Sequence, residues 1–146
     1  DSKGLHIVIT LSNHGAGHAV PSGLPERRLQ VGVELLDARG QVIARDEHSR
    51  GRVLVDAAGQ EAPFFAASRV ERDTRIHPGK SESEDFFLPL AGASKLQIFV
   101  RRRPLPIALW QRLGGSPLAD EPMLQAELEL SGLSTTTEPL LLRLQP

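Results

Sequence analysis

Apolar and polar residues alternate along several stretches of the chain, the pattern of strands that bury one face. The first stretch is residues 5–12, whose apolar face is Leu5, Ile7, Ile9 and Leu11. The second is residues 29–36, with Leu29, Val31, Val33 and Leu35 on one face. A four-residue turn follows, in which Asp37 can cap the backbone and Gly40 can take a positive φ. Residues 41–45 are therefore predicted to return as the partner of 29–36 in a hairpin.

The middle of the chain breaks this alternation. Residues 46–68 carry glycines, small residues and Pro63, so we expect a loop with one short strand at 52–55. Residues 68–90 are predicted to form two strands around a Pro-Gly turn at 77–80, with residues 81–84 in solvent. Alternation returns at 95–103, whose end carries three consecutive arginines, and the run PLLLRLQ at 139–145 predicts a last strand.

Only one segment has the period of a helix. Ile107, Trp110 and Leu113 would share a helical face, and two glycines follow, so a short helix is expected near 105–113 with Trp110 as its anchor. Residues 123–130 contain good helix formers, yet their apolar and polar residues alternate strictly. Because period is the stronger signal, this segment is predicted to be a strand.

About seven short strands and one short helix favour an all-β fold, an antiparallel two-sheet sandwich of the immunoglobulin-like kind. The 146 residues suit a single domain spanning 1–146. The sequence starts almost directly in a strand, and it leaves open whether the domain is a piece of a longer chain.

Composition excludes several classes of protein. The net charge is −1 and basic residues are spread along the chain, which argues against nucleic-acid binding. No window reaches the roughly 18 consecutive apolar residues of a spanning helix, so no direct membrane insertion is expected. The chain has no cysteine, which excludes disulfides, thiolate metal sites and haem attached through Cys-x-x-Cys-His.

Residues 12–28, SNHGAGHAVPSGLPERR, concentrate histidines, glycines, prolines and arginines. Together with the strand-turn-strand that follows, they resemble the C-terminal β-sandwich domain of multihaem c-type cytochromes of the periplasm and cell surface. That domain carries a strand, an Asn, then Gly-His-x-x-Pro-Thr/Ser-Gly, an Arg, and a hairpin turn with Asp-x-x-Gly. The matching positions here are Asn13, Gly17, His18, Pro21, Ser22, Gly23, Arg28 and the turn 37–40. Residues 73–89 resemble the same domain's Pro-Gly turn and aromatic strand, so the resemblance spans roughly residues 5–100.

The resemblance implies a non-catalytic accessory module of an extracytoplasmic multihaem cytochrome or electron-transfer complex, periplasmic or extracellular. The module would shield haem or mediate assembly, with a haem-bearing domain or subunit as partner. The family's Cys-x-x-Cys-His motifs are missing here. Haem c would therefore be held by another segment or chain, unless this is a relative that never had one.

A loop histidine offered to haem iron is the chemistry that this resemblance suggests. His18 is the first candidate ligand and His14 the second. Neighbouring glycines would let the backbone approach a flat macrocycle, and Pro21 would stiffen the loop. The alternative is structural: His18 would donate to a carbonyl, and Arg27 or Arg28 would pair with Glu26 or another nearby carboxylate. Structural roles are also expected of His6, His48 and His77.

Arg101, Arg102 and Arg103 are expected at the exposed end of their strand, where they could contact haem propionates or an acidic partner. We find no catalytic constellation: no Gly-x-Ser-x-Gly elbow is present, and Glu82 and Glu84 are expected in a polar turn. The second class of function is a stand-alone binding or adhesion sandwich with a purely structural loop. A scarcity of aromatic residues, with no Tyr and one Trp, weakens a carbohydrate-binding version of it.

Overall fold

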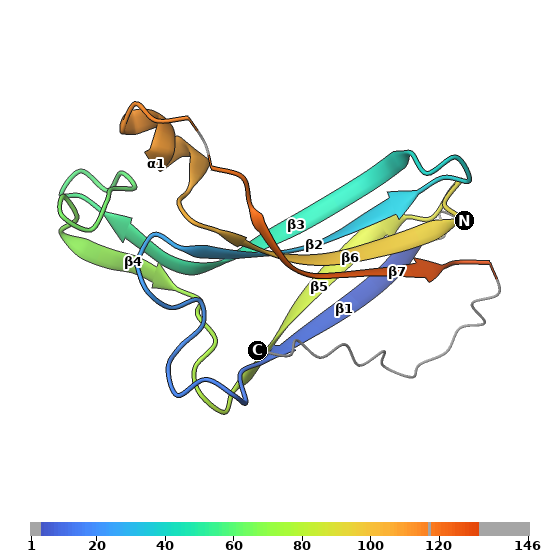
Figure 1. Cartoon of the computed structure of the whole chain (residues 1–146), viewed down its shortest axis with the longest axis horizontal. Helices are drawn as coiled ribbons and strands as arrows, with labels where there is room; N and C mark the ends of the chain where they lie inside the picture. The colour runs from blue at the N-terminus through green and yellow to red at the C-terminus, as the bar shows by residue number, and fades with distance from the viewer. Residues whose placement is uncertain (1–3, 117, 132–146) are drawn as a thin grey trace.

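The computed structural model describes residues 4–116 and 118–131, and in this part it contains seven strands and one short helix (Figure 1). The elements in chain order are β1 (Gly4–Ser12), β2 (Arg28–Leu36), β3 (Val42–Val55), β4 (Arg69–Asp73), β5 (Ser81–Pro89), β6 (Lys95–Arg103), α1 (Ile107–Arg112) and β7 (Glu121–Glu129). The predicted all-β, antiparallel two-sheet sandwich with one short helix is confirmed. The strand predicted at 139–145 lies outside the described residues.

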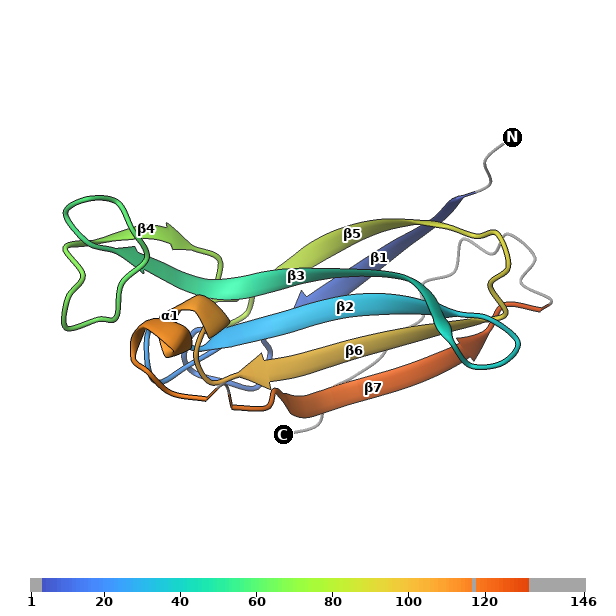
Figure 2. The same ribbon diagram turned by 90° about the horizontal axis from the view of Figure 1, so that it is seen from above.

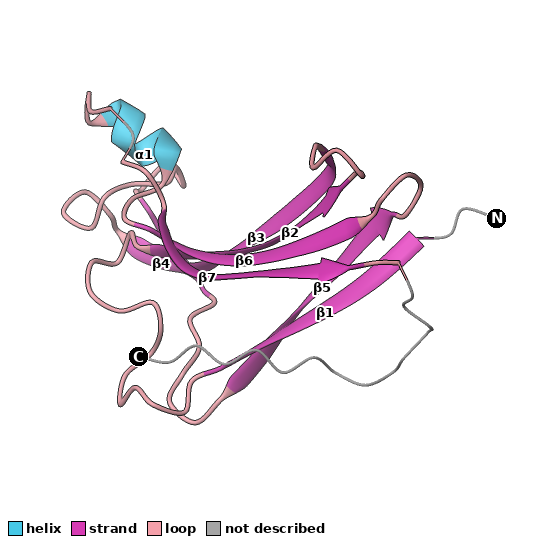
Figure 3. Cartoon of the chain, turned by 45° about the vertical axis from the view of Figure 1, so that its right-hand side comes forward, coloured by secondary structure: helices cyan, strands magenta, loops and turns pink. Residues whose placement is uncertain are grey.

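The strands form two sheets of unequal size. The large sheet has the order β4-β3-β2-β6-β7, and the small sheet pairs β1 with β5. Figure 3 shows the small sheet lying across one face of the large one. Their facing side chains form the core, which consists of Ile7, Leu11, Leu29, Val31, Val33, Leu35, Ile76, Phe86, Leu88, Leu96, Ile98 and Val100. The apolar faces predicted for the first two strands therefore line the core, while β2 is buried on its other face as well.

The hairpin between β2 and β3 is built as expected. The Asp37 Oδ1 atom accepts the amides of Arg39 and Gln41 at 2.8 and 2.9 Å, and Gly40 has a φ of 78°. The same turn recurs after β3, where Asp56 Oδ1 accepts the amides of Ala58 and Gln60. The chain thus uses the pattern Asp-Ala-x-Gly-Gln twice, and each copy ends one strand.

The loop predicted at 46–68 is wrong over its first part, because β3 continues unbroken through residues 46–51. Figure 2 shows β3 extending past the core to reach β4. The charged residues of this stretch obscured its alternation, yet two of them are paired across strands: His48 lies 2.7 Å from Glu84, and Arg50 lies 2.5 Å from the same carboxylate. Likewise, residues 81–84 belong to β5, and only Glu84 among them is turned away from solvent.

The orientation predicted for the helix is also wrong. Leu109 is the buried residue of α1 at 2% exposure, whereas Ile107 and Leu113 are about half exposed, at 47% and 51%. Trp110 is half-buried and its ring lies against Gly115. A helix of six residues is too short for spacing alone to determine which side faces the protein.

Candidate functional site at the loop end of the sandwich

Asn13 organises the loop of residues 13–27, which we call the motif loop. Its side chain is buried, and Nδ2 donates to the carbonyl oxygens of His18 and Ile76 at 2.8 and 3.0 Å. Its Oδ1 atom accepts the Ala16 amide at 3.2 Å. Because an Asn side chain can donate and accept at once, one residue holds both the start of the motif loop and a distant segment.

That distant segment is the Pro-Gly turn at 77–80. The backbone amide of Asn13 donates to the Lys80 carbonyl oxygen at 2.9 Å, and the backbone amide of Gly79 donates to the Asn13 carbonyl oxygen at 2.7 Å. Val20 and Ile76 exchange two further backbone hydrogen bonds at 2.9 and 2.8 Å. The two segments that carry the cytochrome resemblance therefore lie side by side, at the lower left of Figure 1.

The candidate ligands His18 and His14 are both exposed on this loop. His18 Nδ1 lies 3.3 Å from the carbonyl oxygen of Ala19. A carbonyl oxygen can only accept, so the tautomer that donates here has its proton on Nδ1 and a lone pair on Nε2. Metal-binding histidines often show this arrangement, with the second ring nitrogen donating to a backbone carbonyl.

The loop glycines fall into two kinds. Gly23 has a φ of 85°, a backbone conformation that other residues rarely adopt, so the fold itself favours glycine there. Gly15 and Gly17 have no positive φ, and a Cβ at either position would meet nothing within 4 Å. No contact among the described residues explains why positions 15 and 17 are occupied by glycine.

Arg28 is the arginine with a carboxylate partner, which is Glu61 rather than Glu26. Its Nη2 lies 2.8 Å from Glu61 Oε1, and the Arg28 side chain is only 7% exposed. Burial lowers the pKa of the Arg28 guanidinium, and the Glu61 carboxylate opposes that shift. Glu26, also buried, instead accepts the Phe64 amide at 2.5 Å, while Arg27 donates to the Ser22 carbonyl oxygen at 3.3 Å.

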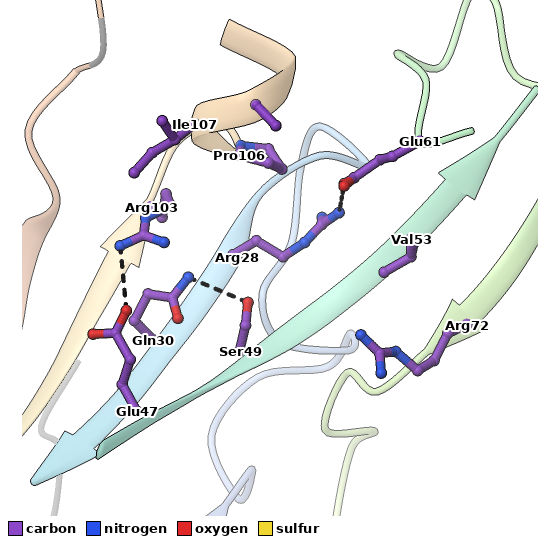
Figure 4. Close-up of a pocket in the computed structure, with 11 residues that line it drawn as sticks. Arg28, Gln30, Glu47, Ser49, Val53, Glu61, Arg72, Arg103, Pro106 and Ile107 are labelled. Carbon is purple, nitrogen blue, oxygen red and sulfur yellow. Dashed lines mark hydrogen bonds and ion pairs between the residues drawn. The ribbon is translucent and has the colours of Figure 1, made fainter. Parts of the chain in front are cut away.

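Next to this pair is an open cleft of about 360 Å³ on the outer face of the large sheet, beside α1 (Figure 4). Its walls combine polar and apolar surface, and they include Gln30, Arg72 and Arg103 besides Arg28 and Glu61. Sequence reasoning missed this cleft, because its residues come from β2, β3, β4, β6, α1 and the loop after β3. No local pattern connects segments so far apart.

The three arginines at the end of β6 are engaged within the chain. The Arg101 guanidinium lies 4.0 Å from the centre of the Phe99 ring, and Arg102 pairs with Glu121. Arg103 pairs with Asp120 at 2.7 Å, and this hydrogen bond raises the pKa of Arg103. Any contact of these arginines with a propionate would compete with these partners.

The remaining histidines have structural surroundings. His6 lies on the exposed face of the small sheet, where it is 2.7 Å from Asp85 and stacks on Phe87. His48 is in a strand rather than the predicted loop, where it contacts Glu84 and stacks on Phe86. His77 is exposed in its turn, as expected.

Two further searches returned nothing in the described ranges 4–116 and 118–131. No group of three or more His, Asp or Glu side chains is placed to hold a metal ion. The helix found there is not long and apolar enough to cross a membrane.

No family model and no curated protein matches the sequence. Among solved structures, the chain is similar to the crystal structure of a penta-haem cytochrome c552 from Thermochromatium tepidum, with a TM-score of 0.75 and 22% identity. The match covers 89% of this chain and 37% of the cytochrome chain. The comparison shows a shared fold, and this chain spans little more than a third of the cytochrome's length.

Proposed function

We propose that this domain is a non-catalytic accessory module of an extracytoplasmic multihaem cytochrome or electron-transfer complex. The observation that carries the proposal is the similarity in fold to a penta-haem cytochrome over 89% of this chain. The loop motif around Asn13 and His18, which resembles a domain of such cytochromes, supports it independently. Haem would be held by the cysteines of another segment or chain, since none is present here. This assignment implies a periplasmic or extracellular location.

Within that role, His18 is the residue proposed to reach haem iron, with His14 as the second candidate. His18 is exposed, and its contact with the Ala19 carbonyl leaves the Nε2 lone pair available. The open space at Gly15 and Gly17 suits the close approach of a flat ring system. Haem supplies one-electron transfer when bound, and this chain would supply an imidazole to its iron.

A second candidate is a stand-alone binding or adhesion module in which the motif loop is purely structural. The observation that favours it is that Asn13, Gly23 and Arg28 all have roles inside the fold. On this alternative the exposed histidines would have no ligand function.

The ligand role is tested by titrating the domain with a haem-c peptide of the microperoxidase type, whose iron has one open axial position. We expect saturable binding with a low-spin Soret shift in wild type and its loss in His18→Ala. His77→Ala is the matched control, because His77 is exposed in the adjoining turn and should leave the shift unchanged. A shift that survives His18→Ala, or none in wild type, would overturn His18 as a ligand.

A further inference from the structure

We propose that the loop end of the domain docks on its haem-bearing partner polypeptide through an apolar tip, formed by Leu24, Phe64 and Phe65, with a flanking group of arginines. This inference rests on the proposed function, which names the partner. It assigns the contact surface, which neither the loop motif nor the fold comparison identifies.

The residues of the apolar tip are each more than half exposed. Leu24 is 54% exposed, Phe64 55% and Phe65 69%. The two rings contact each other edge to face, with centroids 5.5 Å apart, and bury little against the sandwich. An exposed aromatic pair adds little to folding stability, and aromatic residues are enriched in the central contacts of protein interfaces.

The tip is attached to the motif loop. The Phe64 amide donates to the buried Glu26 carboxylate at 2.5 Å, and Leu24 precedes Glu26 by two residues. The turn that carries the phenylalanines is closed by a hydrogen bond from the Ala66 amide to the Pro63 carbonyl oxygen at 2.9 Å. The turn that carries Phe64 and Phe65 is thus held against the end of the motif loop at Glu26.

The charges around the tip favour an acidic partner. Among the described residues, Arg27, Arg72 and Arg112 have no carboxylate within ion-pair distance, although the whole chain has a net charge of −1. Arg72 lines the cleft beside Arg28, and Arg112 donates to the Glu61 carbonyl oxygen nearby. A surface with carboxylates, from acidic side chains or haem propionates, would be complementary to these three guanidinium groups.

The test measures binding of this chain to the purified polypeptide with Cys-x-x-Cys-His motifs that the same or the adjoining gene encodes. Variants are Phe64→Ser with Phe65→Ser, and Arg72→Glu. The matched control is Phe87→Ser, which removes a ring 70% exposed on β5 in the small sheet. Thermal unfolding of each variant shows that the fold is retained.

We expect at least tenfold weaker binding for the double phenylalanine variant, and weaker, less salt-dependent binding for Arg72→Glu. The Phe87→Ser variant should bind as wild type does. The docking surface would be overturned if neither the double phenylalanine variant nor Arg72→Glu changed the binding, or if Phe87→Ser reduced it equally. Either result would leave the proposed function standing. Absence of such a polypeptide, or of wild-type binding to it, would overturn the proposed function itself.

Discussion

At the scale of single residues, Asn13 shows how one side chain can hold a loop that lacks the backbone hydrogen bonds of a sheet. Residues 13–18 form no strand, yet the buried Asn13 side chain donates to the His18 carbonyl oxygen and accepts the Ala16 amide, and it also donates to the Ile76 carbonyl oxygen. Buried polar groups must be satisfied, and here the loop and the turn at 77–80 satisfy each other through this residue.

The Asn13→Ala variant should therefore lose about 2–3 kcal/mol in free energy of unfolding, because the His18 carbonyl oxygen loses this donor, the Ala16 amide loses this acceptor, and the Ile76 carbonyl oxygen keeps only the Val20 amide. Urea denaturation measures the loss. His18→Ala, in the same loop but exposed, should stay within about 0.5 kcal/mol of wild type. Equal losses in both variants would show that the Asn13 contacts do not hold the loop.

Position 32 is occupied by glycine for a different reason, because the neighbouring ring leaves no space for a side chain. Phe99 lies across it on the outer face of the large sheet, at 2% exposure, and a Cβ at position 32 would be 2.3 Å from the ring. Gly32→Ala should cost about 1–3 kcal/mol, because the ring must move out of its packed position. In a Phe99→Leu background the same substitution should cost clearly less. An undiminished cost there would assign the effect to the backbone instead.

At the scale of elements, one edge of the sandwich is closed by charges. Glu84 of β5 reaches β3, where it is 2.5 Å from Arg50 Nε and 2.7 Å from His48 Nδ1. Arg50 and Glu84 are 10% and 13% exposed, so little water is present to replace either partner.

Glu84→Gln should lower the free energy of unfolding by about 2–3 kcal/mol, since Arg50 would keep a buried charge without its main counter-ion. Glu82→Gln is the matched control, because Glu82 is 50% exposed and 3.7 Å from Arg50. Denaturant unfolding of both variants decides the point. A loss for Glu82→Gln as large as that for Glu84→Gln would contradict the role given to Glu84.

An ion pair at the end of β4 makes the stability of the fold depend on pH. A hydrogen bond from Arg75 lowers the pKa of Asp73, whose carboxylate is 2.6 Å from the guanidinium. A carboxyl with a lowered folded-state pKa stabilises the fold above its unfolded pKa of about 3.9, and this contribution is lost as the pH falls through the folded-state value. Between pH 5 and acid conditions near pH 2, Asp73→Asn should lose less stability than wild type, by about 0.5 kcal/mol. Urea denaturation of both proteins at each pH measures the difference in their free energies of unfolding. An equal decline in the two proteins would contradict the prediction.

At the scale of the whole molecule, the candidate features gather at one end. The motif loop, the turn at 77–80 and α1 all lie at the left in Figures 1 and 3, while the β2–β3 turn lies at the opposite end. The cleft is lined in part by α1 and so belongs to the same end. The core between the two sheets stabilises the arrangement, and the loops at this end are free to present exposed groups.

This separation predicts that stability and partner binding respond to different residues. Gly15→Ala combined with Gly17→Ala should leave the thermal midpoint unchanged, because neither glycine has a positive φ or a close neighbour. The same variant should bind the haem-bearing polypeptide more weakly if the backbone approaches it closely. A lowered midpoint would instead show that these glycines serve the loop's own fold.

Much of the fold could be predicted because its signals are local. Alternation identified the strands at 5–12, 29–36, 95–103 and 123–130, and the Asp-x-x-Gly turn was correctly assigned. The extent of β3 was missed: residues 41–45 and 52–55 were predicted as strands and its end at Val55 was correct, but residues 46–51 between them were assigned to a loop. Charged residues that pair across strands look like a loop in the sequence, since their partners are not visible there.

The candidate site was predictable only in part. The loop residues could be singled out by their types, but the role of Asn13 depends on Ile76 and Lys80, more than 60 residues away in the chain. The cleft and the apolar tip depend on how separate loops are placed, which no single segment encodes.

The sequence by itself determined the strands, their buried faces, the hairpin turn and the absence of covalent haem attachment, because each depends on residue type and on spacing between near neighbours. The tertiary structure decided that β1 pairs with β5, that Glu84 is shielded, that Leu109 rather than Trp110 is the buried residue of the helix, and that two loops share Asn13. These outcomes rest on contacts between distant segments, whose free energy depends on the whole assembly of sheets.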